Sequence, residues 1–125
     1  MVNKTQKQIG VLLLNLGGPD RLQDVEPFLY NLFSDRQIIR LSPFPILQKP
    51  LAWFIANRRA PKSCKAYKQI GGGSPLKRIT AEQGQELEKV LSRVADFKVK
   101  MAMRYWHPGA EKVLEEFWQA GITDI

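Results

Sequence analysis

Apolar residues follow a strand-like pattern in three places along this chain. Residues 9–16 (IGVLLLNL) form a short apolar run without helical period, and a Gly-Gly-Pro turn follows it. Such a run is typical of a strand that is buried on both faces of a parallel sheet. Residues 97–105 alternate at first between apolar and basic side chains and predict a second strand. Residues 122–125 resemble the start of a third strand.

Helical periodicity marks three segments around these strands. Apolar positions repeat at helical spacing from Val25, and Asp24 can cap that helix. Residues 80–83 (TAEQ) fit a capping box for a second helix. His107 and Pro108 fit the N-cap and first position of a third. The apolar stripes expected to face the core are Val25, Phe28, Leu29, Leu32 and Phe33, then Leu87, Val90, Leu91 and Val94, then Val113, Leu114 and Phe117.

Prolines and glycines interrupt the middle of the chain. Residues 40–50 contain three prolines, so we expect no regular structure there. Residues 51–57 and 61–69 predict two short helices, the second beginning at Pro61. Residues 71–75 (GGGSP) predict a loop.

The order of strands and helices predicts an α/β fold, with a short parallel sheet flanked by helices. A length of 125 residues supports one domain. Because the predicted sheet has two strands and the start of a third, we expect a partial Rossmann-like domain, truncated at its third strand and belonging to a longer protein.

Single cysteine and histidine residues limit the chemistry of the chain. Cys64 alone cannot form an internal disulfide or a cysteine metal cluster, and His107 alone excludes a multi-histidine site. No apolar stretch approaches the length that spans a bilayer, and residues 1–8 show no signal peptide. We therefore expect a cytoplasmic protein without a metal site of its own.

The charge of the chain is unevenly distributed. Its net charge is +7, but residues 1–78 hold 13 basic and 4 acidic residues, and residues 49–78 hold eight basic residues and no acid. Such a stretch fits a solvated face, an anionic membrane, nucleic acid or an anionic ligand. Three aromatic residues lie in or near it, at Phe44, Trp53 and Phe54. They suit either an interfacial lip on anionic lipid or a core-packed helix with a basic rim.

The carboxyl ends of the predicted strands are the places where ligands bind in open α/β sheets. At the second strand, Arg104 can hold a carboxylate in a bidentate fork, and Tyr105 and Trp106 offer flat apolar faces. In the GGGSP loop, glycine lets the backbone approach a ligand, and Ser74 offers a hydrogen-bonding group. Ordinary turns, one with a buried aromatic residue, explain the same sequences.

Four motifs together resemble the N-terminal part of ferrochelatase, in its cyanobacterial and plastid branch. They are GVLLLNLGGPD, DVEPFLYNLFSD, YKQIGGGSPL and MRYWHPG, and the match runs from about residue 9 to residue 125. The resemblance implies that residues 1–125 are an incomplete first chelatase-type domain. It also implies an enzyme of haem biosynthesis that inserts ferrous iron into protoporphyrin IX. Both would be substrates, and no cofactor is expected.

The resemblance assigns substrate-binding roles and no catalytic role. In the family, the proton-accepting histidine and its partner glutamate come from the second half, and His107 matches a different position. The implied porphyrin contacts are Leu16 under the ring plane, Leu32, Phe33 and much of residues 41–55 at the apolar mouth, Arg58 on the lip, Tyr67 and Ser74 in the pocket, Arg104 near the propionates, and Tyr105 beside the macrocycle.

Two other interpretations stay open at this stage. One is a small nucleic-acid-binding module, in which residues 49–78 bind phosphates and Trp53, Phe54 and Tyr67 stack on bases. The other is an inactive truncation product. In the ferrochelatase interpretation the partners are porphyrin, iron and an anionic membrane surface bound peripherally, with no nucleic acid. Residues 122–125 would then form a free sheet edge through which the chain could self-associate.

Overall fold

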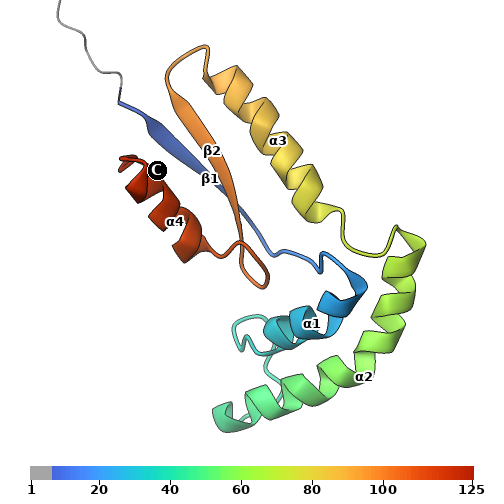
Figure 1. Cartoon of the computed structure of the whole chain (residues 1–125). Helices are drawn as coiled ribbons and strands as arrows, with labels where there is room; N and C mark the ends of the chain where they lie inside the picture. The colour runs from blue at the N-terminus through green and yellow to red at the C-terminus, as the bar shows by residue number, and fades with distance from the viewer. Residues whose placement is uncertain (1–6) are drawn as a thin grey trace, which may run out of the picture. The chain divides into compact units, whose positions relative to one another are not determined.

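The computed structural model describes residues 7–125, which form two compact units (Figure 1). The described residues up to Leu16 and the segment Lys77–Ile125 form the first, which we call the sheet unit. Gly17–Leu76 form the second, which we call the helical unit. The signal-peptide prediction for residues 1–8 falls mainly on residues 1–6, outside the described residues.

Two parallel strands form the centre of the sheet unit. Strand β1 (Ile9–Asn15) pairs with β2 (Phe97–Met103), and their first residues lie opposite each other. Helices flank this pair, so both predicted strands and the α/β class with a short parallel sheet are confirmed. Of the predicted start of a third strand, the structure contains a single parallel bridge between Asp124 and Ile9, with one backbone hydrogen bond from Gly10 N–H to Asp124 O (2.8 Å).

Helices α3 (Leu76–Leu91) and α4 (Ala110–Gln119) cover opposite faces of this sheet (Figure 1). Gly84 of α3 faces Leu13 and Val99, whereas α4 packs on the face that carries the alternate residues. The core on the α4 side consists of Ala102, Val113, Phe117 and Ile122, with Leu12 packed against it.

The prediction that β1 is buried on both faces is wrong at the carboxyl end of the strand. Leu14 and Leu16 are exposed, although the run is apolar throughout. Neither helix of the sheet unit covers these side chains, so the strand ends at an open apolar surface.

Helix α3 begins one turn earlier than its capping-box prediction. The Leu76 N–H donates to Ser74 Oγ (3.2 Å), so Ser74 caps this helix and Thr80 lies buried inside it. The predicted stripe is also displaced, because Val90 and Val94 are exposed. Thr80 and Gly84, one turn apart, are the buried positions of α3, and such small residues let the helix approach the sheet closely.

Helix α4 begins later than predicted. Gly109 is its N-cap, and the two residues before it belong to a loop in which the His107–Pro108 peptide is cis. That loop turns back onto β2, where the Met103 N–H donates to Pro108 O (2.7 Å). The predicted stripe is buried at Val113 and Phe117 but exposed at Leu114.

Helix α1 (Val25–Phe33) begins where the sequence predicts, directly after Asp24, but the predicted cap is wrong: the Asp24 side chain makes no capping hydrogen bond to this helix and accepts from Arg21 N–H (3.2 Å) instead. Helix α2 (Gln48–Gln69) replaces two predicted short helices and part of a predicted irregular segment. Pro50 lies in its first turn, where a missing N–H costs no hydrogen bond. Pro61 lies inside it, and both Pro61 and Asn57, whose carbonyl loses its partner, are on the exposed side, where water can replace the lost bond.

Close packing with α1 explains why α2 continues through Pro61. Its buried face carries Ala52, Ala56 and Ala60 at intervals of one turn. These small side chains let α2 approach α1, whose buried residues are Val25 and Phe28. This interface extends along α2 to Ala60, next to Pro61. Its stabilisation offsets the free-energy cost of the internal proline.

Candidate functional site

The carboxyl ends of β1 and β2 lie side by side, as parallel pairing requires. Pairing continues beyond the strands, since Arg104 N–H donates to Asn15 O (2.9 Å) and Tyr105 N–H donates to Leu16 O (3.0 Å). Three of the residues singled out in the sequence, Leu16, Arg104 and Tyr105, therefore meet in the sheet unit.

A cavity of about 490 Å³ opens at this end of the sheet. Its wall is largely apolar, and Leu16 within it is 51% exposed. Sequence reasoning chose two of the six residues that line it, Leu16 and Arg104. Three of the others lie one or two positions before a chosen residue, so the strand pattern could have identified them, whereas Ala110 comes from the start of α4. The cavity is lined by Leu14, Asn15, Leu16, Met103, Arg104 and Ala110.

At the end of β2, Arg104 lines the cavity with a charged group, and the ring of Tyr105 lies next to that group. Arg104 is exposed, and its guanidinium carbon lies 5.4 Å from the centroid of the Tyr105 ring. Tyr105 itself is buried, so its ring supports the guanidinium from below by a cation–π contact. An apolar surface with a guanidinium at its edge suits a flat apolar molecule that carries carboxylates.

In the helical unit, the Gly-Gly-Pro turn and the GGGSP loop pack against each other. Ser74 N–H donates to Pro19 O (2.8 Å). A Cβ atom at Gly18 would lie 2.7 Å from Ser74, and one at Gly73 would collide with the carbonyl oxygen of Asp20. Only glycine fits these two positions, so two motifs that are weak separately form one tight backbone junction.

Ser74 and Tyr67 both lie near this junction and are half-buried. The Ser74 hydroxyl accepts a bond from the start of α3, as described above. Tyr67 lies in the last turn of α2, and its carbonyl accepts from Gly72 N–H (2.8 Å). The backbone of both residues thus orders the loop between the two helices.

Leu32, Phe33 and Arg58 lie elsewhere in the helical unit. Leu32 and Phe33 end α1 and are half-buried, with the Arg59 guanidinium carbon 5.5 Å from the Phe33 ring centroid. Arg58 is exposed on α2 and lines a shallow cavity of about 240 Å³ with Trp53 and Phe54. The eight predicted residues therefore form separate groups within their own units.

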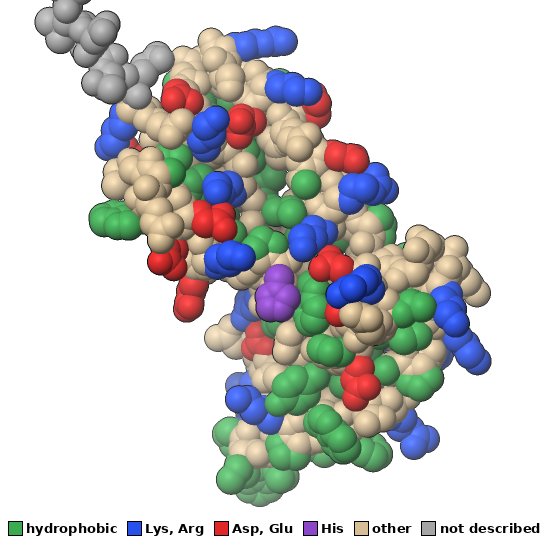
Figure 2. Space-filling view, viewed as in Figure 1, with side chains coloured by type: hydrophobic (Ala, Val, Ile, Leu, Met, Phe, Trp, Pro, Cys, Tyr) green, Lys and Arg blue, Asp and Glu red, His purple; other side chains and the backbone are tan. Residues whose placement is uncertain are grey.

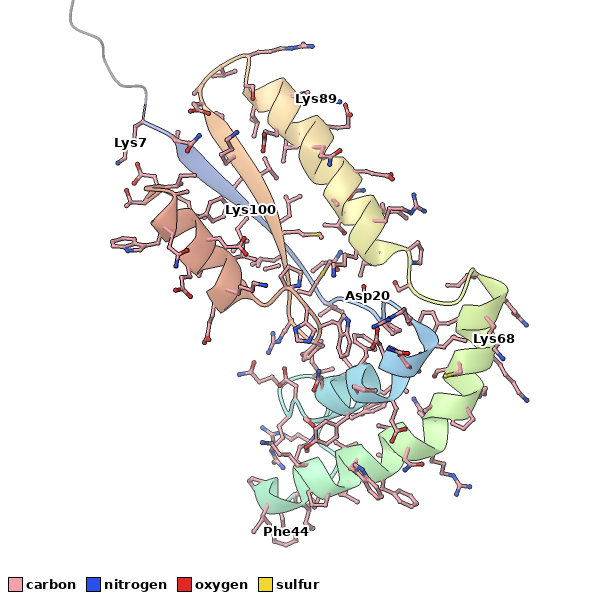
Figure 3. All side chains as sticks on the ribbon, viewed as in Figure 1. Lys7, Asp20, Phe44, Lys68, Lys89 and Lys100 are labelled. Carbon is pink, nitrogen blue, oxygen red and sulfur yellow. The ribbon has the colours of Figure 1, made fainter. Side chains whose placement is uncertain are left out.

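An extensive exposed apolar surface marks the helical unit (Figure 2). Phe44 is 64% exposed and projects away from the N-terminal end of α2 (Figure 3). Trp53 and Phe54 are 58% and 56% exposed, so these aromatic side chains are not part of a packed core, although α2 packs on α1 through its alanines. We call the exposed apolar side chains between residues 38 and 54, taken together, the apolar lip; they are Ile38, Ile39, Phe44, Ile46, Leu47, Trp53 and Phe54.

On α4, Glu116 has a perturbed pKa. Lys100 Nζ lies 2.8 Å from Glu116 Oε2, and this hydrogen bond and charge lower the pKa of Glu116 below its ordinary value. Glu116 does not line the cavity at the strand ends. The ring of His107 lies 4.9 Å from that of Trp106, between centroids, and His107 does not line that cavity either.

The structure of residues 7–125 bears on metal binding and on membrane crossing. No three side chains of His, Cys, Asp or Glu converge there as a metal site would need. Of the helices in this part of the chain, none has both the length and the apolar composition needed to cross a membrane.

Comparison with known proteins gives a consistent match. The family model described as Ferrochelatase matches residues 8–125. Ferrochelatase from Cyanothece sp. (strain PCC 7425 / ATCC 29141) is 62% identical over 119 residues, covering 94% of this chain and 30% of that protein. Ferrochelatases from Nostoc punctiforme and Gloeobacter violaceus are 60% and 58% identical, with 30% and 36% of their lengths covered. The chain thus spans about a third of the length of these curated relatives.

Proposed function

The chain belongs to the ferrochelatase family, and we propose that it supplies porphyrin-contacting residues to an enzyme that inserts ferrous iron into protoporphyrin IX. The observation that carries this proposal is the open cavity at the carboxyl ends of β1 and β2. It combines exposed leucine side chains with one guanidinium, and protoporphyrin IX combines a flat apolar ring with propionates.

We propose distinct roles for Leu16 and Arg104, which line this cavity, and for Tyr105 beside Arg104. Leu16 packs against one face of the macrocycle, because it is apolar and half-exposed at the strand end. Arg104 pairs with a propionate, and Tyr105 fixes the position of its guanidinium. By family membership, we propose that five residues of the helical unit also contact the porphyrin: Leu32, Phe33, Arg58, Tyr67 and Ser74.

Metal insertion itself requires groups outside this chain. When Fe²⁺ enters, the two pyrrole N–H protons must leave, so a positioned base has to accept them. Distortion of the ring would first expose the nitrogen lone pairs, which favours the bent transition state over the flat substrate. We assign no catalytic residue here and treat iron and porphyrin as substrates, with no resident cofactor. The chain alone should bind porphyrin weakly and insert no metal, because it offers one wall only.

Porphyrin fluorescence titration tests the proposal. We expect saturable binding of protoporphyrin IX that Leu16→Asp abolishes, since a carboxylate would meet the apolar ring. Leu114→Asp, at an exposed leucine of α4, is the matched control and should bind as the wild type does. Arg104→Ala should weaken binding by no more than about fivefold, because an exposed ion pair contributes about 0–1 kcal/mol. Equal binding by Leu16→Asp and the control would contradict the proposal.

Anionic membrane is the second partner that we propose, bound peripherally by the apolar lip. Its aromatic side chains suit the interface, and each neighbouring cation contributes about 1 kcal/mol near an anionic surface. The helical unit holds nine basic and four acidic residues, which favours anionic lipid. This binding would place a cytoplasmic protein at the membrane surface.

Vesicle co-sedimentation tests the membrane proposal. Binding to vesicles of phosphatidylserine and phosphatidylcholine should exceed binding to phosphatidylcholine alone and should fall as salt rises. Phe44→Ser should reduce it, whereas Leu114→Ser should not. Salt-insensitive binding that is equal on both vesicles would contradict the electrostatic part.

Self-association is a further proposal for the sheet unit. The segment after α4 contributes one bridge to β1, and Ile125 beside it is 55% exposed. Backbone groups at such an edge can pair with another copy. Sedimentation across a concentration series should show dimers, and a strict monomer at high concentration would contradict this.

A further inference from the structure

Gln48 is a buried polar side chain at the start of α2, and no role has yet been assigned to it. It is only 3% exposed, although it lies beside the largely exposed segment of residues 34–47. A buried amide is stable only where its hydrogen bonds are made, so its partners define what it holds.

The side chain of Gln48 joins both helices to the segment between them. Its Nε2 donates to Phe33 O (2.7 Å) and to Ile39 O (3.0 Å), and its Oε1 accepts from Leu41 N–H (3.3 Å). Phe33 is the last residue of α1, where a carbonyl has no intrahelical donor. The side-chain amide of Gln48 therefore links the start of α2 to the end of α1 and to two residues of the segment between these helices.

Other bonds in the segment are local. Arg36 Nη1 donates to Ser42 O (3.0 Å), and Phe44 N–H donates to Ser42 Oγ (3.2 Å). These bonds shape the segment within itself, whereas those of Gln48 tie it to the helices. The segment carries Ile38, Ile39 and Phe44 of the apolar lip, and it follows Leu32 and Phe33 directly.

We propose that Gln48 is a positioning residue that holds residues 34–47 so that Leu32, Phe33 and the apolar lip present a preformed entrance surface to the porphyrin. This inference rests on the proposed function. A surface on an unfixed segment must be ordered during binding, which weakens affinity, whereas a preformed surface avoids that cost. Loss of Gln48 should therefore reduce affinity while the rest of the fold is kept.

Amide hydrogen exchange in the 125-residue chain tests the holding role. Gln48→Met keeps the length of the side chain and removes its donors and its amide acceptor. The Leu41 amide should then exchange about tenfold faster or more, as expected for one lost buried hydrogen bond. Gln69→Met, at the exposed far end of α2, is the control and should leave Leu41 unchanged. If Gln48→Met prevents folding, Gln48→Asn replaces it, because it keeps a neutral amide but shortens the side chain by one methylene group, so that it no longer reaches these partners.

Two exchange results would overturn the proposal. One is an unchanged rate at Leu41. The other is equal acceleration along α2 and the segment, which would make Gln48 a general stabilising residue.

Porphyrin affinity tests the positioning role and separates it from the proposed function. Gln48→Met should bind protoporphyrin IX severalfold more weakly, at a temperature where both proteins are folded, and Gln69→Met should match the wild type. Wild-type affinity in Gln48→Met would overturn the inference alone. Absence of binding in the wild-type chain would contradict the proposed function, while the exchange rates would still decide whether Gln48 holds the segment.

Discussion

The core of the sheet unit contains a fully buried aromatic side chain, Phe117, whereas the face of α2 that packs on α1 carries alanines and leaves Trp53 and Phe54 exposed. Part of the apolar area of the sheet unit thus builds its own core. Along α2, close helix contact through small residues provides the packing and leaves these two aromatic side chains at the surface. Apolar side chains that a unit does not bury are available to a ligand or a membrane.

The two units also differ in net charge. The sheet unit, from residue 7, holds nine basic and eight acidic residues, whereas the helical unit holds nine and four, net charges of +1 and +5. Charged side chains pair across elements of the sheet unit, as Lys100 of β2 does with Glu116 of α4 (Figure 3). In the helical unit, basic residues outnumber acidic ones, and this excess of positive charge lies in the same unit as the apolar lip.

The largest effect should come from truncating the core of the sheet unit. Phe117→Ala should lower the free energy of unfolding by about 3–5 kcal/mol, because it opens a cavity. Trp53→Ala removes a larger side chain from the surface of the helical unit and should cost at most about 0.5 kcal/mol. Chemical denaturation, monitored separately for each unit by NMR, measures both. Similar losses of unfolding free energy in the two variants would mean that Phe117 and Trp53 are buried to a similar extent, which would contradict the comparison.

A smaller effect should follow from enlarging the alanine interface. Ala52→Leu should destabilise the packing of α1 on α2 by about 1–3 kcal/mol, since Ala52 is fully buried and a larger side chain must displace its neighbours. Ala66→Leu makes the same exchange at an exposed position of the same helix and should be nearly neutral. Hydrogen exchange of the α2 amides reports the difference. If both variants exchange alike, close packing does not hold this unit.

The smallest effect concerns the Lys100–Glu116 pair. Lys100→Met removes the hydrogen bond and the charge that lower the pKa of Glu116, so this pKa should rise. Because the folded pKa is depressed, the stabilisation by this pair is present above the unfolded pKa and is lost as pH falls through the folded pKa. NMR titration of the Glu116 carboxyl carbon measures the shift, and Lys112→Met should shift it less. An unchanged pKa in Lys100→Met would contradict the pairing.

Much of the fold follows from the sequence because its signals are local. The apolar pattern predicts both strands and the start of α1. The errors came where tertiary contacts outweigh a local signal. Alanine packing carries α2 through Pro61, and a hydroxyl at Ser74 caps α3 before Thr80 can.

Prediction of the site was limited in a similar way. The meeting of Leu16 with Arg104 follows from parallel pairing, which the strand pattern implies. The role of Gln48 does not, because a glutamine in a proline-rich stretch gives no sign that its partners lie up to 15 residues away. Nor does sequence reveal that Gly18 and Gly73 serve one junction.

Chemical-shift mapping with protoporphyrin IX tests the central claim most directly. Backbone ¹H–¹⁵N spectra of the chain, recorded as porphyrin is added, report which residues it contacts. The account predicts the largest shifts at the ends of β1 and β2, at Leu16, Arg104 and Tyr105, with smaller ones at the apolar lip. Shifts confined to the basic residues of 49–78, or none at all, would contradict it, and the former, reproduced by an oligonucleotide, would favour nucleic-acid binding.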